Sequence, residues 1–259
     1  MVRVAFAHLS CRFLPHLPSV HSSENMYPTP EDEAVIRAAD ELMIKTMARY
    51  DPSHDAYHVQ RVRKTALHLA RALSLSEVGR KPDLLTVELS ALLHDVLDKK
   101  YVSAAEAADP YAFFRPFFDF VASTHGVDLV KDGRAREIAK IVDNVSWSTE
   151  KKLREAGLLG EWHRDCIELH CVQDADRLDA IGAFGILRCA AYSTVMNRPL
   201  HIPHDDSAYS SCAIEHFHEK LLHIRERLKT EPGKELAEKR HQLMLDFLQA
   251  VDEEYYVER

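Results

Sequence analysis

The chain has 259 residues, of which 46% are hydrophobic and 29% are charged, a composition that suits a globular protein with a substantial core. Its net charge of −8 opposes non-specific binding to nucleic acid polymers and to anionic membranes. A small anionic ligand is compatible with this charge, because a metal ion or a lysine cluster can reverse its sign within one pocket. Five cysteines without a C-x-x-C pair argue against a disulfide framework and favour a reducing compartment such as the cytoplasm.

Residues 1–29 differ in composition from the rest of the chain. They contain two arginines, several serines and prolines, and no acid before Glu24. We predict a disordered N-terminal extension, and the alternative is an organelle-targeting presequence, because such segments are basic and poor in acids. Residues 30–255 are predicted to form a single domain. Eight glycines in the whole chain and few strand-like alternations indicate that this domain is mostly helical.

The first two predicted helices begin at clear capping residues. Thr29 precedes a proline and two acids, which predicts a helix start and a helix to about residue 49. A second helix, capped by Ser53 or Asp55, is predicted to reach about residue 75. His58 lies in its first turn on an apolar face, where it is either a hydrogen-bonded core residue or a ligand.

A third helix is predicted after Pro82 and Asp83, because four leucines follow at helical spacing: Leu85, Leu89, Leu92 and Leu93. The pair His94-Asp95 stands where this buried helix ends. Charged groups there need compensation. A divalent metal and a hydrogen-bonded helix terminus are the two alternatives that the stretch leaves open.

The segment from 104 to 119 is predicted to be irregular, with aromatic residues that pack in the core or form a lid over a site. A helix is then expected to end near Asn144, followed by a polar segment and a loop at Gly157 and Gly160. A further helix is predicted from Cys166 to about Ala191. It carries Asp176 on an apolar face, where a carboxylate needs a charged or hydrogen-bonding partner.

Two amphipathic helices are predicted at the C-terminal end of the chain. Their apolar stripes are Ile214, Phe217, Leu221, Ile224 and Leu228 in the first, and Leu243, Phe247 and Ala250 in the second. Between the two large helical regions, residues 197–206 read as a loop that holds a further pair, His204-Asp205. We expect this pair to lie away from the site, because it has no apolar periodicity around it.

Three predicted helices thus offer inward metal-type ligands: His58, His94 with Asp95, and Asp176. Two imidazoles and two carboxylates suit Mn²⁺, Mg²⁺, Fe²⁺, Co²⁺ or Ni²⁺, and zinc is an alternative. Such a site serves phosphoryl chemistry, because the metal lowers the pKa of a bound water and polarises a phosphate oxygen. The candidate substrate-binding residues are Arg61, Lys99, Asn144 and Arg177, and the candidate catalytic residues are Asp98 and Lys100. Asp98 either handles the attacking water or forms a salt bridge with a nearby lysine.

Three motifs together resemble one enzyme family. They are H-x-x-R-V at 58–62, L-L-H-D at 92–95 and D-A-D-R-L-D-A-I-G-A at 174–183, and the stretch 94–101 reads H-D-x-x-D-x-K-Y. This combination resembles the HD-domain superfamily of metal-dependent phosphohydrolases over about residues 30–255. The resemblance implies an all-α fold, an HD-domain helical bundle with a C-terminal helical extension, and one divalent metal held by His58, His94, Asp95 and Asp176. It also implies a phosphorylated small molecule, in particular a nucleotide, as substrate.

Other functional classes are still open at this point. A phosphomonoesterase for another metabolite would have the same motifs. A non-catalytic metal-stabilised sensor would keep the fold, although intact ligands beside Asp98 and Lys100 argue against it. Oxygenase chemistry with two irons needs further ligands, and we regard His125 and His163 as the available candidates between the second and third motifs. We expect no nucleic acid polymer and no membrane as partners, and a homo-oligomer is compatible with the sequence.

Overall fold

The computed structural model describes residues 27–48, 50, 55–76, 79–97, 102–103 and 105–257. Its helices and short 3-10 helices (η) have these bounds: α1 Pro30–Met47, α2 Ala56–Ser74, α3 Leu84–Leu93, η1 Glu106–Ala108, α4 Pro110–His125, α5 Arg134–Asn144, α6 Trp147–Glu155, α7 Glu161–Asp165, α8 Ile167–Asp179, α9 Gly182–Val195, η2 Tyr209–Ser211, α10 Ala213–Glu219, η3 Leu221–His223, η4 Arg225–Arg227 and α11 Glu231–Tyr255. These ranges contain no strand, which confirms the predicted all-α class. The predicted extension, residues 1–29, lies almost entirely outside the described residues.

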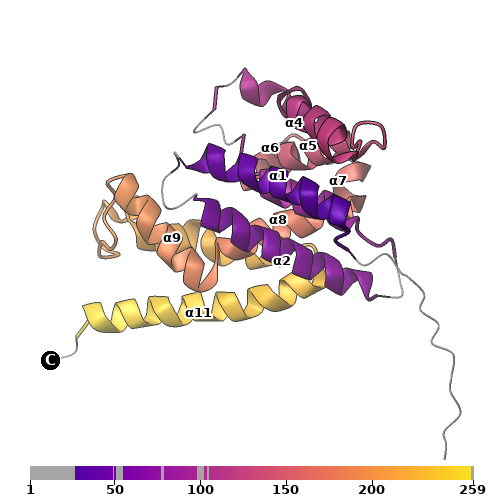
Figure 1. Cartoon of the computed structure of the whole chain (residues 1–259). Coiled ribbons are helices and arrows are strands. Elements are labelled where there is room, and N and C mark those ends of the chain that lie inside the picture. The colour runs from indigo at the N-terminus through magenta and orange to yellow at the C-terminus, as the bar shows by residue number, and fades with distance from the viewer. Residues whose placement is uncertain are drawn as a thin grey trace, which may run out of the picture.

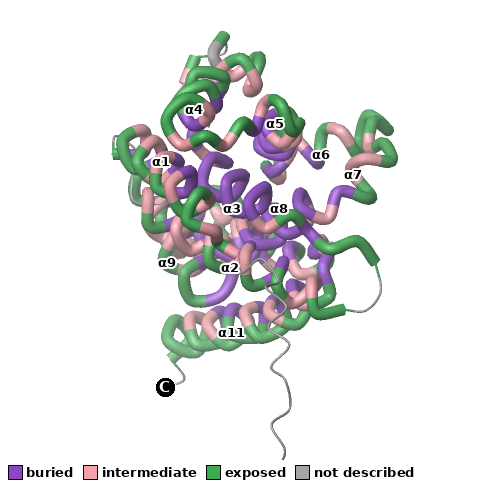
Figure 2. Tube along the Cα trace, turned by 45° about the vertical axis from the view of Figure 1, so that its right-hand side comes forward, coloured by how far each residue is buried: buried purple, intermediate pink, exposed green. Residues whose placement is uncertain are grey.

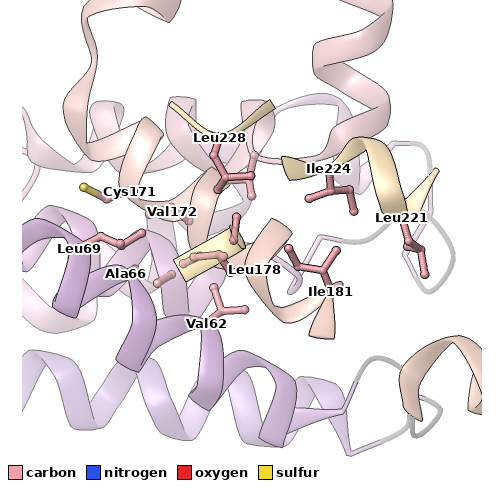
Figure 3. Close-up of a cluster of buried hydrophobic side chains, with 14 of the residues drawn as sticks. Val62, Ala66, Leu69, Cys171, Val172, Leu178, Ile181, Leu221, Ile224 and Leu228 are labelled. Atoms are coloured by element: carbon pink, nitrogen blue, oxygen red, sulfur yellow. The ribbon is translucent and has the colours of Figure 1, made fainter. Parts of the chain in front are cut away.

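Helix α3 lies in the middle of the bundle and is buried all round (Figure 2). One core joins α3 to α1, α4 and α5, and its largest side chains include Phe114 and Phe118. A second core joins α2, α8, α10 and α11, and Figure 3 shows Val62 and Leu69 of α2 meeting Leu178 of α8 in it. Both cores include residues of α3, so this helix is firmly packed within the bundle. The residues that follow Leu93 therefore start from a fixed position.

The predicted helix starts at Thr29, Asp55 and Asp83 are confirmed. Thr29 and Asp32 form a capping box, and the carboxylates of Asp55 and Asp83 accept hydrogen bonds from the backbone amides of the first turns of α2 and α3. The four leucines of α3 are all buried, as the spacing predicts. The third helix therefore ends at His94 inside the protein, in agreement with the sequence.

The predicted continuous helix from Cys166 to Ala191 is wrong. The chain breaks after Asp179 and bends by 68° between α8 and α9. Gly182 has a φ of +73°, a left-handed conformation that glycine adopts without strain, and a Cβ there would lie 2.9 Å from the Arg240 side chain of α11. The absence of a side chain at Gly182 therefore also lets α11 approach closely. The long helix α11 runs along one side of the bundle beneath α2 and α9 (Figure 1).

Three further local predictions are corrected. The segment from 104 to 119 is largely helical, because Asp109 caps α4 and Pro110 occupies its first turn, where the missing N–H is harmless. Its aromatics belong to the core, as expected. The stripe from Ile214 to Leu228 is buried, but short helices and turns carry it. On α11 the buried face is Ala237, His241, Met244 and Leu248, whereas the predicted Leu243 is exposed.

No single helix of the described residues is both long and apolar enough to cross a membrane. The bent pair α8 and α9 passes the same test of length and composition when the two are taken together.

Candidate metal centre

Each predicted ligand is placed by a local feature of its helix. His58 is the third residue of α2, and its amide donates to the capping carboxylate of Asp55 at 2.9 Å. His94 is the C-cap of α3, and its Nδ1 lies 2.8 Å from the carbonyl oxygen of Ala91. Asp95 follows in the turn, and Asp176 comes from α8. Because a carbonyl only accepts, Nδ1 of His94 carries the proton and Nε2 presents a lone pair.

The structure brings these four side chains together. Nε2 of His58 lies 3.4 Å from Oδ2 of Asp95 and 3.5 Å from Oδ1 of Asp176. Nε2 of His94 lies 3.5 Å from Oδ1 of Asp95 and 3.9 Å from Oδ1 of Asp176. Atoms bound to one ion at about 2.1 Å are roughly 3.0–3.4 Å from one another. The separations therefore suit a shared cation after small side-chain movements.

The donor atoms also fit a metal ion chemically. Nε2 of His94 is buried and makes no hydrogen bond within the part of the chain that the structure describes. Its lone pair faces carboxylate oxygens, so a cation is needed between them. His58, His94 and Asp95 form a group in which one ligand atom from each lies within 4.8 Å of the others, and Asp176 adds the contacts above. Two imidazoles and two carboxylates could hold a divalent transition metal or Mg²⁺.

A third aspartate, Asp179 of the 174–183 motif, holds His58 in place. Oδ2 of Asp179 lies 2.7 Å from Nδ1 of His58, so that nitrogen carries the proton and Nε2 is left for a metal. Arg61 donates to both oxygens of Asp179 at 2.7 and 3.0 Å, and Arg188 donates at 3.2 Å. A carboxylate behind a metal-binding histidine is a common orienting arrangement. The i, i+3 spacing of Asp176 and Asp179 on one helix was the available signal.

The carboxylates around His58 create an excess of negative charge. Burial alone would disfavour the charged imidazole, but its hydrogen bonds to the carboxylates of Asp176, Asp179 and Asp95 outweigh burial and raise the pKa of His58 to about 10. Burial likewise opposes ionisation of Asp176, but the neighbouring imidazoles hold its pKa below the ordinary value. A cluster that retains a proton so strongly can exchange that proton for a metal cation.

The four side chains open into a cavity of about 710 Å³, a size typical of small-molecule sites. Trp147 and Leu97 contribute apolar wall. Of the described residues, three cationic side chains line it, namely Lys152 of α6, Arg188 of α9 and Lys220 after α10. Sequence reasoning named none of the three as a site residue, because no local pattern around them indicates a ligand.

Three of the four predicted substrate-binding residues do not line the cavity. Arg61 is bound to Asp179 and lies 4.3 Å over the ring of Phe184, and Arg177 is buried against Glu150. Asn144 donates to the carbonyl of Lys140. None of the three lines the cavity, because neighbouring elements already use their polar groups. Asp98, Lys99 and Lys100 lie outside the described residues, so their roles stay predictions.

The remaining histidines of interest are not near this centre. His163 lies 3.1 Å from Oδ1 of Asn144, His125 packs edge-on against Phe120, and His204 packs against Tyr209. None of them lines the cavity, in keeping with the expectations for His204.

Comparison with known proteins agrees with this arrangement. The family model of the HD domain matches residues 55–181, which include all four converging side chains. The protein YpgQ of Bacillus subtilis (strain 168) is 32% identical over 206 residues, covering 78% of this chain and 84% of that protein.

Solved structures of similar fold cover nearly the whole domain. The structure of an HD-superfamily hydrolase from Bacillus thuringiensis is 26% identical, with a TM-score of 0.63 over 88% of this chain and all of that one (100%). The structure of B. subtilis YpgQ in complex with ADP has a TM-score of 0.60 at 24% identity, over 86% of this chain and 96% of that one. By the matching domain model, the extended identity and the convergence of the motif residues, the chain belongs to the HD-domain superfamily.

Proposed function

We propose that this protein is a metal-dependent phosphohydrolase that acts on a nucleotide. The observation that carries the proposal is the convergence of His58, His94, Asp95 and Asp176 at the floor of a cavity lined by cations. A divalent ion held by these four residues would supply a water of lowered pKa and would polarise a phosphate oxygen. The same ligand set is what the family resemblance implies.

The lining of the cavity suits a phosphate group. Lys152, Arg188 and Lys220 are placed to neutralise the charge of phosphate oxygens. Arg188 also donates a hydrogen bond to Asp179, the residue that orients His58. This hydrogen bond holds the arginine in position beside the cavity. We further propose that Asp98 or Lys100 handles the proton of the attacking water, as the motif spacing suggests.

Two observations support a nucleotide as the substrate: the size of the cavity and a relative that has been solved with ADP. A cavity of about 710 Å³ can contain a nucleotide, and Trp147 offers an aromatic surface for a base. YpgQ, which is 32% identical in sequence, has been solved in complex with ADP. Manganese as the metal, a cytoplasmic location and a homo-oligomer stay predictions from the sequence.

The test combines metal analysis with a substrate panel. The protein is stripped with a chelator, reloaded with Mn²⁺, Mg²⁺, Fe²⁺, Co²⁺ or Ni²⁺, and assayed for phosphate and pyrophosphate release from nucleoside mono-, di- and triphosphates. We expect one ion per chain and hydrolysis that requires it. Stoichiometric metal and nucleotide binding without release of either product under any metal would favour the non-catalytic sensor instead.

A further inference from the structure

A second cavity adjoins the metal-centre cavity. It has a volume of about 370 Å³, and Trp147 and Lys220 line both cavities. We call it the basic pocket and define it by Trp147, Lys151, Arg154, Lys220, His223 and Arg227. Glu155 and Glu219 also line it, and they contact Lys151 at 3.9 Å and His216 at 3.8 Å. Four cationic residues therefore face two acids in a protein whose net charge is −8.

The wall behind the basic pocket increases this excess of positive charge. Glu150 is buried, and four cationic groups surround its carboxylate: Arg154 at 3.0 Å, Lys229 at 3.4 Å, Arg227 at 3.6 Å, and Arg177 in direct contact. One carboxylate cannot balance four cations. Burial and repulsion from Arg154 lower the pKa of Arg227, which is the expected effect of this crowding.

Some guanidinium N–H groups of this wall make no hydrogen bond among the described residues. Nε and Nη2 of Arg227 are buried and make no hydrogen bond among the described residues, and the same holds for Nε of Arg177. The guanidinium carbon of Arg227 lies 4.6 Å from the ring centroid of Trp147, a side chain that lines both cavities. Small movements would turn its planar donors towards an anion.

We propose that the basic pocket is a second binding site for a phosphate group, and that it binds this group without a metal ion. Phosphate matches the site because guanidinium groups bind its oxygens in pairs and lysines add point charges. Two sources present this chemistry. One is free inorganic phosphate or pyrophosphate, and the other is a phosphate of a ligand that also enters the metal-centre cavity past Trp147 and Lys220.

The test measures binding of inorganic pyrophosphate by calorimetry in excess EDTA, so that metal-dependent hydrolysis and binding through a metal ion are absent. The variant is Lys151→Ala with Arg154→Ala, whose side chains are 62% and 49% exposed and are suited to replacement without unfolding. The matched control is Lys45→Ala with Arg37→Ala on α1, where Arg37 also pairs with a glutamate four residues away. Thermal unfolding of both variants is recorded alongside.

We expect binding in the wild type, a loss of affinity of at least about tenfold in the pocket variant, and no change in the control. Absence of binding to the wild type, or equal affinity in both double variants, would overturn the site. A second readout uses Trp162→Phe, which leaves Trp147 as the single tryptophan, and its emission should change on addition of pyrophosphate.

Competition with ADP then identifies the source of the phosphate. Displacement of pyrophosphate by ADP supports a site for the phosphates of the ligand in the neighbouring cavity, and joint binding supports a site for free phosphate. Because EDTA is present throughout, failure of this site leaves the metal-dependent hydrolysis untouched, and failure of hydrolysis leaves this test valid.

Discussion

Asp174 and Asp176 lie two residues apart on α8 and face different parts of the molecule. Asp174 is fully buried, and its carboxylate accepts hydrogen bonds from the amides of Lys229 and Thr230 and from the hydroxyl of Thr230, at 2.7–3.0 Å. Asp176 is 26% exposed towards the cavity and faces imidazole nitrogens at 3.5 and 3.9 Å. The carboxylate of Asp174 therefore has its hydrogen bonds satisfied within the protein, whereas the carboxylate of Asp176 faces the cavity.

The difference separates a structural carboxylate from a ligand. Thr230 is the N-cap of α11, so Asp174 fastens the start of the C-terminal helix to α8. Asp176 lies among other hydrogen-bond acceptors, and within the described part of the chain too few hydrogen-bond donors are close enough to satisfy them. This arrangement is unfavourable unless a cation is present. The surroundings of the carboxylate, and not the residue type, thus distinguish the candidate ligand Asp176, which faces the cavity, from Asp174, whose hydrogen bonds are satisfied within the protein.

The substitution Asp176→Ala tests the candidate ligand and should have the largest effect. We expect it to abolish metal binding and metal-dependent hydrolysis, a larger loss than the roughly 10–100-fold that outer-shell changes produce, and to leave the far-ultraviolet circular dichroism unchanged. Asp95→Ala should behave alike. His204→Ala is the control, because that histidine lies outside the cavity, and it should be nearly silent. A fully active Asp176→Ala protein would remove the ligand assignment.

Asp174→Ala should show the opposite behaviour. It leaves the amides of Lys229 and Thr230 without their acceptor, and we expect a loss of about 3 kcal/mol in the free energy of unfolding, measured in urea. Metal stoichiometry in the folded protein should stay that of the wild type. A variant of wild-type stability that loses its metal would reverse the assignment of the two aspartates.

The substitution Asp179→Asn tests the carboxylate that orients His58. The amide keeps the shape of the carboxylate but weakens its hold on Nδ1 of His58 and removes the charge that Arg61 and Arg188 share. We expect metal affinity to fall by roughly 10–100-fold, as for other carboxylates behind metal-bound histidines. Titration with a competing chelator measures this directly, and an unchanged affinity would mean that Asp179 serves folding alone.

A further prediction concerns the pH dependence of the metal-free protein. The pKa of His58 is raised from 6.5 to about 10, so its stabilising contribution is present below pH 6.5 and is lost as the pH rises towards 10. The free energy of unfolding in EDTA should therefore fall in this window, by at most about 1.4 kcal/mol per pH unit. Urea unfolding at several pH values measures it, with the metal-loaded protein as the control. A flat profile in EDTA would contradict the proton-retaining cluster.

Much of the candidate centre was accessible from sequence because its signals are local. Capping residues placed His58 in the first turn of α2, and the leucine spacing placed His94 and Asp95 at the buried end of α3. The apolar face of the fourth segment placed Asp176 inward. These inferences hold because helix periodicity and termini depend on residues three or four apart.

The destinations of the charged side chains were accessible only from the tertiary structure. Arg61 and Arg177 stand beside predicted ligands in sequence, yet Asp179 and Glu150, from segments 118 and 27 residues away, bind them. Lys152, Arg188 and Lys220 reach the cavity from other helices, and the close approach of Arg240 accompanies the bend at Gly182.

The sequence by itself thus determined the helical class and the four candidate ligands, whose side chains converge in the structure. The tertiary structure decided which aspartate of α8 is satisfied, which cations face the cavity and where the basic pocket lies. The physical reason is that a long charged side chain binds whichever partner the packing of distant helices brings within about 3 Å, and no local pattern records that partner.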